Sequence, residues 1–403
     1  MLPFPPDARP PLAGVRVLEA ARILAGPFCG QLLADLGAEV VKVERPGTGD
    51  DTRGWGPPFH GPLSAYFLSC NRSKKSVTLD IQTPGGAAVL DALLARADVL
   101  IENFRTDSLP KLGLTPDAVL ARHPRLVVCS ISGYGRTGPR KDDPGYDFAV
   151  QALSGLMAVT GPPNGPPYKV GVALADVLTG LYAAAAILAC LRARETSGHG
   201  YAIDLALQDC AVAAQVNVAQ AYLASGTVPV RQGNAHLQIV PYQSFATADG
   251  FLVLNVGNDG QWRAFCAAAG EPDLGADPRF ATNRLRVERR AEVVPKVEAV
   301  MRTKPTAEWE RLLQAANVPH AVVRDYAGVF ADEQTAARGM KVTVRDPDGN
   351  PVDLVGSPLH VAGATLPPAA LAPALGADTA AVLAEWAGVS GERLEELRAA
   401  GAV

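Results

Sequence analysis

The sequence lacks the signatures of several common functional sites. Its six cysteines form no CxxC pair, and none of its six histidines stands at metal-ligand spacing from another, which disfavours a zinc site or a disulfide framework. No GxSxG elbow is present, so a serine-hydrolase interpretation is weak. Basic residues are not in excess, with 37 Lys and Arg against 41 Asp and Glu, which argues against a nucleic-acid partner.

Long apolar runs are lacking as well. The longest smooth run covers 181–191 and is too short to cross a bilayer. The first residues show no basic segment followed by an apolar one, as a secretory signal would. We therefore expect a cytoplasmic protein with no membrane partner, whose cysteines are mostly buried free thiols.

What is present is the composition of a folded protein, 48% hydrophobic and 19% charged over 403 residues. Strand-like and helix-like stretches alternate through the first half, which indicates βαβ units. The sequence therefore predicts an α/β fold with a Rossmann-like large domain and a mostly parallel sheet. The expected strands cover 15–19, 40–44, 76–80, 99–102, 125–132 and 201–205, and the helices 27–36, 84–96, 115–122, 176–191 and 208–224.

The pattern breaks near Val228, and a smaller α/β unit follows. Its expected elements are a strand at 251–255 and helices at 261–269, 291–301 and 306–316. We predict a large domain over 1–225, a small domain over 226–330, and a linker that returns to the large domain over 331–403. The last part contains strands near 340–352 and a helix at 377–386.

The ends of the expected strands carry cations and aromatic side chains. The turn after the first strand lacks the GxGxxG of a dinucleotide site. Instead, Arg45 follows the second strand, Asn103, Phe104 and Lys111 follow the fourth, and Arg136 follows the fifth. Ligands of open α/β sheets bind at these strand ends, and cations there suit a phosphorylated ligand.

Asp176 is the only charged residue in the apolar stretch 171–180, which leads into a long helix. One interpretation is a helix N-cap, because Asp is a favoured capping residue. The other is a carboxylate nucleophile, kept ionised by the helix N-terminus and stripped of water by apolar neighbours. The two interpretations are compatible.

The segment 255–262, rich in Asn, Asp and Gly, follows a strand and opens a helix. It is either an ordinary βα loop or a mobile cover over an active site.

With these residues in view, the chain resembles the family III CoA-transferases. The likeness is carried by segments 17–27, 36–50, 71–80, 101–104, 133–139 and 171–180, in that order along the first half. Segments 49–59, 129–135 and 233–243 are most similar to family members that transfer CoA from succinyl-CoA to glutarate.

The resemblance implies that Asp176 is the catalytic aspartate and that acyl-CoA is a substrate, with no tightly bound cofactor. Gly257 and Gly260 fall in the family's glycine loop, where this chain has Asn258 and Asp259 in place of glycines. Arg22 and Leu24 also depart from the family pattern, in a loop that contacts CoA. The residues expected at the CoA site are Arg22, Ile23, Arg45, Leu79, Asn103, Phe104, Lys111, Arg136, Tyr146 and Asp147.

The family folds as an interlocked, ring-like homodimer, which we expect here. The implied reaction moves CoA from a donor such as succinyl-CoA to a dicarboxylate such as glutarate, through an aspartyl anhydride and an aspartyl-CoA thioester. We hypothesise that the acceptor is held by Arg53 or Lys169, with His236, Gln238 and Tyr242 nearby.

Three alternatives remain. An α-methylacyl-CoA racemase would need a second acid or base, but Tyr146 stands where those enzymes have a histidine, and tyrosine is a poor proton shuttle near neutral pH. A formyl- or oxalate-type CoA-transferase would take a different acceptor. A non-catalytic CoA-binding protein would not need Asp176.

Overall fold

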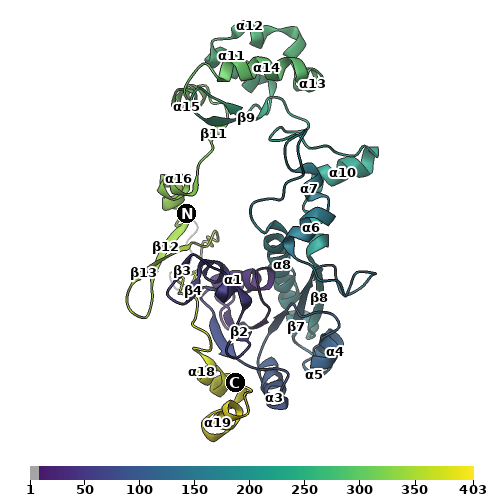
Figure 1. Cartoon of the computed structure of the whole chain (residues 1–403), viewed down its shortest axis with the longest axis vertical. Helices are drawn as coiled ribbons and strands as arrows, with labels where there is room; N and C mark the ends of the chain where they lie inside the picture. The colour runs from purple at the N-terminus through teal and green to yellow at the C-terminus, as the bar shows by residue number, and fades with distance from the viewer. Residues whose placement is uncertain (1–8) are drawn as a thin grey trace. The chain divides into compact units, whose positions relative to one another are not determined.

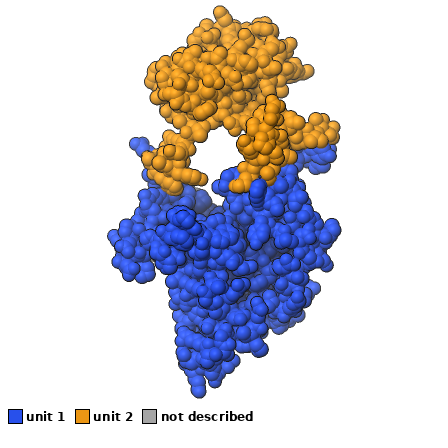
Figure 2. Space-filling view, viewed as in Figure 1, with its two compact units in different colours: residues 1–156, 170–224, 333–403 blue, residues 157–169, 225–332 orange. Residues whose placement is uncertain are grey.

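The computed structural model describes residues 9–403, and the chain divides into two compact units (Figure 2). Unit 1 runs to Leu156 and also contains 170–224 and 333–403, whereas unit 2 contains 157–169 and 225–332. The segment 157–169 lies inside the predicted large domain but groups with unit 2. The reason is Arg231, whose guanidinium donates hydrogen bonds to the carbonyls of Ala158, Pro162 and Gly165.

Unit 1 is built on a six-stranded sheet in the order β5-β2-β1-β6-β7-β8, in which every neighbouring pair is parallel. This confirms the predicted mixed α/β fold with a mostly parallel sheet. Its central strands are continuous apolar runs, as expected for strands covered on both faces. The strands are β1 (Arg16–Ala20), β2 (Glu39–Glu44), β5 (Lys75–Thr78), β6 (Val99–Glu102), β7 (Val127–Ser132) and β8 (Tyr201–Ala206).

Helices cover both faces of this sheet (Figure 1). Alternate residues of β1 point to opposite sides, so Val17 packs with α1 (Ala25–Asp35) and α8 (Leu174–Ser197). Leu18 packs on the other side with α3 (Pro84–Leu94), α5 (Pro116–Arg122), α18 (Thr379–Ala387) and α19 (Gly391–Ala399). The C-terminal residues therefore complete the second face, and α19 is a helix that the sequence patterns did not predict.

The strand order reverses between β1 and β6. The next strands in the sequence, β2 and β5, lie on one side of β1, whereas β6 lies on its other side. The crevice at the carboxyl ends of two such strands is where ligands of open α/β sheets bind. The fold therefore marks the ends of β1 and β6 as the place to look for a site.

Helix α8 is long and apolar enough to cross a membrane by length and composition alone, and within residues 9–403 it is the only such helix. It extends well beyond the 181–191 run noted in the sequence. The same test is passed by core helices of soluble proteins, and α8 contributes Ala183, Ile187 and Leu191 to the core that it shares with α1.

The predicted helix over 208–224 is wrong in one respect, because it divides into α9 (Leu207–Ala213) and α10 (Val216–Ser225). Val216 has a φ of 27°, which breaks the helix. The Gln215 side chain donates to the carbonyls of Ser154 and Ala211 at this point.

Unit 2 has its own core around a three-stranded antiparallel sheet, in the order β11-β10-β9. Buried Trp262, Phe265 and Trp309 pack the helices onto it. Its elements are β9 (Tyr242–Ala246), β10 (Phe251–Asn255), α11 (Asp259–Ala269), α12 (Pro272–Ala276), α13 (Asn283–Glu288), α14 (Arg290–Met301), α15 (Thr306–Ala315), β11 (His320–Val322) and α16 (Tyr326–Ala331).

The remaining elements are short. Two hairpins, β3 with β4 and β12 with β13, lie in unit 1. The bounds are β3 (Phe59–His60), β4 (Leu63–Ser64), α2 (Ala65–Asn71), α4 (Leu109–Leu112), α6 (Asp147–Leu153), α7 (Leu156–Val159), α17 (Glu333–Ala337), β12 (Lys341–Arg345), β13 (Pro351–Val355) and the 3-10 turns Asp51–Gly54 and Pro278–Phe280.

Candidate active site

Two cavities of unit 1 meet at the carboxyl ends of β1 and β6. The first, of about 550 Å³, is lined by Arg45, Leu79, Phe104 and Lys111, among others. The second, of about 260 Å³, contains Asp176. Arg22 and Phe104 line both cavities, so a long ligand could pass from one to the other. Of the sequence-predicted CoA residues, Ile23, Asn103, Arg136 and Tyr146 line the second cavity.

The first cavity is suited to an anionic ligand. Arg45 and Lys111 line it, and among the described residues no carboxylate oxygen lies within 4 Å of either charged group in an ion pair. Leu79, Ile81 and Phe104 supply apolar surface beside these cations. A phosphorylated group with an aromatic or aliphatic part matches this combination.

A buried cluster of charges supports the floor of the site. The Lys42 ammonium group on β2 is fully buried and lies 2.9 Å from carboxylate oxygens of both Glu19 and Asp50. Burial opposes its charge, but Glu19, Asp50 and Glu44 raise the pKa of Lys42 above its usual value. Glu19 is also 2.7 Å from the ammonium group of Lys74. Each buried charge is thus paired.

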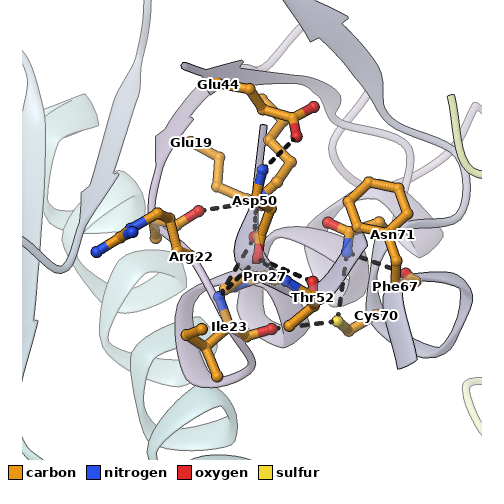
Figure 3. Close-up of polar contacts among 12 residues, drawn as sticks. Glu19, Arg22, Ile23, Pro27, Glu44, Asp50, Thr52, Phe67, Cys70 and Asn71 are labelled. Carbon is orange, nitrogen blue, oxygen red and sulfur yellow. Dashed lines mark hydrogen bonds and ion pairs between the residues drawn. The ribbon is translucent and has the colours of Figure 1, made fainter. Parts of the chain in front are cut away.

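This cluster holds the turn that joins β1 to α1. Lys42 donates to the Ala21 carbonyl at 2.7 Å. Asp50 accepts a hydrogen bond from the Ile23 N–H, as Figure 3 shows. Ile23 has a φ of 73°, an uncommon conformation for a branched side chain. Just after β6, the Asn103 side chain accepts from the Arg22 N–H at 3.0 Å and donates to the Arg22 carbonyl at 2.8 Å. The turn is therefore fixed from several directions.

Asp176 lies in the first turn of α8 and is largely buried. It lines the second cavity together with Ala25, the first residue of α1. Burial, and then the negative charge of Asp147, raise the pKa of Asp176 to about 7. Burial therefore opposes the ionisation that the helix N-terminus was expected to favour.

The interpretation of Asp176 as the N-cap is also wrong. The helix begins at Leu174 with Ala173 as the cap residue, so Asp176 already lies inside it. The Asp147 carboxylate on α6 satisfies the helix start instead, accepting the Ala175 N–H at 2.8 Å. Asp147 also accepts a hydrogen bond from the fully buried Gln151. The carboxylate at the start of α8 is thus that of Asp147 and not that of Asp176.

Two predicted arginines are occupied by structural contacts. Arg53, a predicted acceptor ligand, binds the buried Glu44 carboxylate through Nε and Nη2 at 2.7 and 2.6 Å and stacks on Phe67. Arg136 binds Glu102 at 2.8 Å and donates to the Phe104 carbonyl at 2.7 Å. Arg53 is therefore a poor candidate for binding substrate, because its guanidinium group is already paired with the Glu44 carboxylate.

The other predicted acceptor residues lie in unit 2. The His236 ring accepts the Gln238 N–H at 3.1 Å and contacts the Tyr242 ring at 5.3 Å between centroids, so these three residues form one local group. Lys169 also belongs to unit 2. Tyr242 lines a separate cavity on the β-sheet of that unit, together with Asn234 and Ser244.

Gly257 and Gly260 belong to a loop of unit 2 that is held by its own side chains. The Gly257 N–H donates to Gln261 Oε1 at 2.8 Å, and Asn258 caps α11 by accepting the Gln261 N–H. Asp259 pairs with the fully buried guanidinium of Arg286 at 2.9 Å. The two residues that replace glycines in this chain therefore each have a structural partner.

Sequence reasoning missed Tyr66 on α2. Burial, and then the charge of Asp176, raise the pKa of Tyr66 to about 12, so the phenol lies in the field of Asp176 and keeps its proton. Its ring packs edge-on against Trp55, with centroids 5.1 Å apart. Lys42 was missed as well. No local pattern marks either residue, because the importance of each comes from what the fold places beside it.

Comparison with known proteins identifies the class. The model of CoA-transferase family III matches residues 12–379, and the chain belongs to this family of enzymes. A succinate–glutarate CoA-transferase from Agrobacterium fabrum is 44% identical over 391 residues, covering 94% of this chain and 96% of that protein. Human succinyl-CoA:glutarate CoA-transferase is 39% identical over 393 residues, covering 98% and 90%.

A solved structure agrees with this assignment. The crystal structure of a CaiB/BaiF family protein from Brucella suis matches with a TM-score of 0.84 at 43% sequence identity. The match covers 94% of this chain and all of that chain.

The buried cluster makes a prediction about stability. Lys42→Met should lower the free energy of unfolding by about 3–5 kcal/mol, because it leaves Asp50 and part of Glu19 without a counter-charge. Lys75→Met is the matched control, since it removes only the partly exposed pair with Glu39 and should cost no more than about 1 kcal/mol. Urea unfolding followed by circular dichroism measures both, and equal losses for the two variants would contradict the role given to Lys42.

Proposed function

We propose that this enzyme transfers CoA from succinyl-CoA to a dicarboxylic acid such as glutarate, with Asp176 as the covalent carrier. The observation that carries the proposal is the place of Asp176, a largely buried carboxylate in a cavity that shares Arg22 and Phe104 with a cation-lined cavity. A CoA thioester has the matching form, with phosphates at one end and the reacting carbonyl at the other. The glutarate transferases among the relatives support the choice of substrates.

The proposed reaction has four steps, each an acyl transfer. The Asp176 carboxylate attacks the donor thioester, which releases CoA thiolate and forms an acyl-aspartyl anhydride. The thiolate attacks the Asp176 carbonyl carbon, releasing the donor acid and leaving an aspartyl-CoA thioester. The acceptor carboxylate displaces the thiolate to form a second anhydride. The thiolate then takes the acceptor acyl group and restores Asp176.

The CoA-binding residues follow from this route. Arg45 and Lys111 bind phosphate groups, while Leu79 and Phe104 contact the apolar parts of the coenzyme. Arg22, Ile23, Asn103 and Tyr146 surround the thioester end. Because one thioester is exchanged for another, the reaction needs no tightly bound cofactor.

The acceptor site is assigned to Lys169, His236, Gln238 and Tyr242, and Arg53 is left out because it is paired with Glu44. Gly257 and Gly260 are proposed to shield the intermediates from water. A racemase is less well supported, because residue 146 is a tyrosine where those enzymes have a histidine, the usual side chain for shuttling a proton. A formyl- or oxalate-type transferase remains the alternative, and a screen of acceptor acids distinguishes it from a transferase that uses glutarate.

We also propose a cytoplasmic homodimer. Large apolar side chains are exposed along α6, α8 and α10 of unit 1, including Phe148, Leu181, Tyr182 and Leu223. Apolar surface of this extent on a folded chain suits burial against a second copy.

Replacing the nucleophile tests the central assignment. Asp176→Ala should lower transfer by at least about 10⁴-fold, because no other group can carry the acyl chain. Calorimetric binding of CoA should be retained, since Arg45 and Lys111 are untouched. Asp209→Ala, an acidic residue in the first turn of α9, is the control and should remain active. Full turnover by Asp176→Ala would remove the covalent route.

The pH dependence follows from the position of Asp176. Only the ionised carboxylate attacks, and its pKa is raised to about 7, so kcat should rise with pH through a midpoint near that value. Asp147→Asn removes one of the two causes of the shift and should move the midpoint to lower pH. The profile should be measured from about pH 5 to about pH 9, roughly two units on each side of the midpoint. A rate that does not change over this range would contradict the assignment.

The acceptor class can be tested directly. Succinyl-CoA incubated with a panel of carboxylic acids should yield the acyl-CoA of dicarboxylates such as glutarate, detected by mass spectrometry. His236→Ala should raise KM for the acceptor more than KM for the acyl-CoA. Preference for formate or other monocarboxylates would overturn the proposed acceptor.

A further inference from the structure

We propose that Arg136 is a positioning residue for acyl-CoA and not a ligand of it. Paired with Glu102, its guanidinium group holds the backbone of Phe104 and joins two chain segments that line the second cavity. The inference rests on the proposed function, since it needs acyl-CoA to occupy the two cavities that Phe104 lines.

The guanidinium group of Arg136 has no N–H group free for a ligand. Nη2 lies 2.8 and 3.1 Å from the two carboxylate oxygens of Glu102. Nη1 donates to the Phe104 carbonyl at 2.7 Å and to the Thr106 hydroxyl at 3.2 Å. The remaining donor, Nε, is buried. A phosphate or carbonyl group of CoA would therefore have to displace one of these partners in order to bind this side chain.

The ion pair holds both backbone groups of Phe104. The Phe104 N–H donates to Glu102 Oε2 at 2.8 Å, and the Phe104 carbonyl accepts from Arg136. The Glu102 side chain, at the end of β6, is completely buried, and burial raises its pKa while the charge of Arg136 opposes the rise. Because a buried carboxylate without its partner is costly, the pair resists separation and fixes the residue that lines both cavities.

The same guanidinium group joins two walls of the second cavity. One wall is the segment 103–106, which follows β6, and the other belongs to the loop 133–146, which follows β7. The Thr106 hydroxyl accepts a hydrogen bond from Arg136 and donates one to the Lys141 carbonyl at 2.7 Å. Removing the arginine would therefore loosen the connection between the walls as well as the hold on the first of them.

The loop that carries Arg136 is itself anchored. The Arg136 N–H lies 3.0 and 3.2 Å from the two carboxylate oxygens of Asp204 on β8. Near the ends of the loop the backbone approaches itself closely, since a Cβ added to Gly133 would lie 2.5 Å from Cα of Gly145. The guanidinium group thus reaches Phe104 from a fixed point, and the cavity wall is in place before a ligand binds.

Three variants of the full-length enzyme separate positioning from direct binding. Arg136→Met removes the charge and the donors, Glu102→Met removes the partner that would otherwise occupy the guanidinium group, and Arg136→Lys keeps the charge without the planar fork. Each should weaken CoA binding, measured by calorimetry, by roughly tenfold. Each should also lower kcat/KM for succinyl-CoA by about 10²-fold, the loss expected when a substrate is misplaced by about 1 Å.

Arg194→Met is the matched control, and circular dichroism checks that every variant is folded. The Arg194 side chain is 13% exposed, against 11% for Arg136. It pairs with Asp98 at 2.9 Å and donates to the Arg125 carbonyl, just before β6 and β7 begin, and none of these three residues lines either cavity. The control should lose stability and keep the CoA affinity and kcat/KM of the unaltered enzyme.

Several results would overturn the inference. Weaker CoA binding by Arg136→Met together with unchanged or tighter binding by Glu102→Met would mean that Arg136 binds CoA directly. Losses no larger than those of Arg194→Met would mean that the pair only stabilises the fold. If the two methionine variants at the pair do not fold, Arg136→Lys decides, and full CoA affinity in that variant would contradict the need for the planar fork.

The same measurements distinguish this inference from the proposed function. If the unaltered enzyme bound no CoA, the proposed function would fail and the inference with it. If the unaltered enzyme binds CoA and the three variants bind it equally well, only the inference fails.

Discussion

The buried ammonium group of Lys42 is the interaction on which the site depends. It forms ion pairs with Glu19 and Asp50 in the interior of unit 1 and also donates a hydrogen bond to the Ala21 carbonyl. The turn that it fixes lies where the strand order of the sheet reverses, between β1 and β6. Any rearrangement that left one of these buried charges without its partner would cost several kcal/mol of stability, so the side chains of the network have few other arrangements. The start of α1 is therefore placed by the core and not by a flexible loop.

Two carboxylates near the start of α8 have different surroundings, and this separates their roles. Asp147 accepts hydrogen bonds from Ala175 and Gln151, which stabilise its negative charge. Burial, and then the negative charge of Asp147, raise the pKa of Asp176 to about 7. A poorly solvated carboxylate is a more reactive nucleophile than one in water, provided that it is ionised. The proposed chemistry uses this balance between reactivity and ionisation.

Much of the fold was predictable from the sequence, because parallel strands buried on both faces appear as short apolar runs, as at 99–102 and 125–132. The cations that the sequence places after strand ends, Arg45 and Lys111, do line the first cavity. Other features depend on contacts between distant segments and leave no local pattern. Asp176 has the sequence context of a cap, yet the cap comes from Asp147, and Arg53 has the context of a ligand, yet it pairs with Glu44. The grouping of 157–169 with unit 2 depends likewise on Arg231.

The central claim is that Asp176 carries CoA covalently between two acids. The most direct measurement is to incubate the enzyme with succinyl-CoA alone, treat it with hydroxylamine or borohydride, and analyse the peptides by mass spectrometry. The account predicts a hydroxamate or a reduced side chain at Asp176 and nowhere else among the carboxylates of the site. An unmodified peptide around Asp176, with transfer activity intact in the same sample, would contradict it.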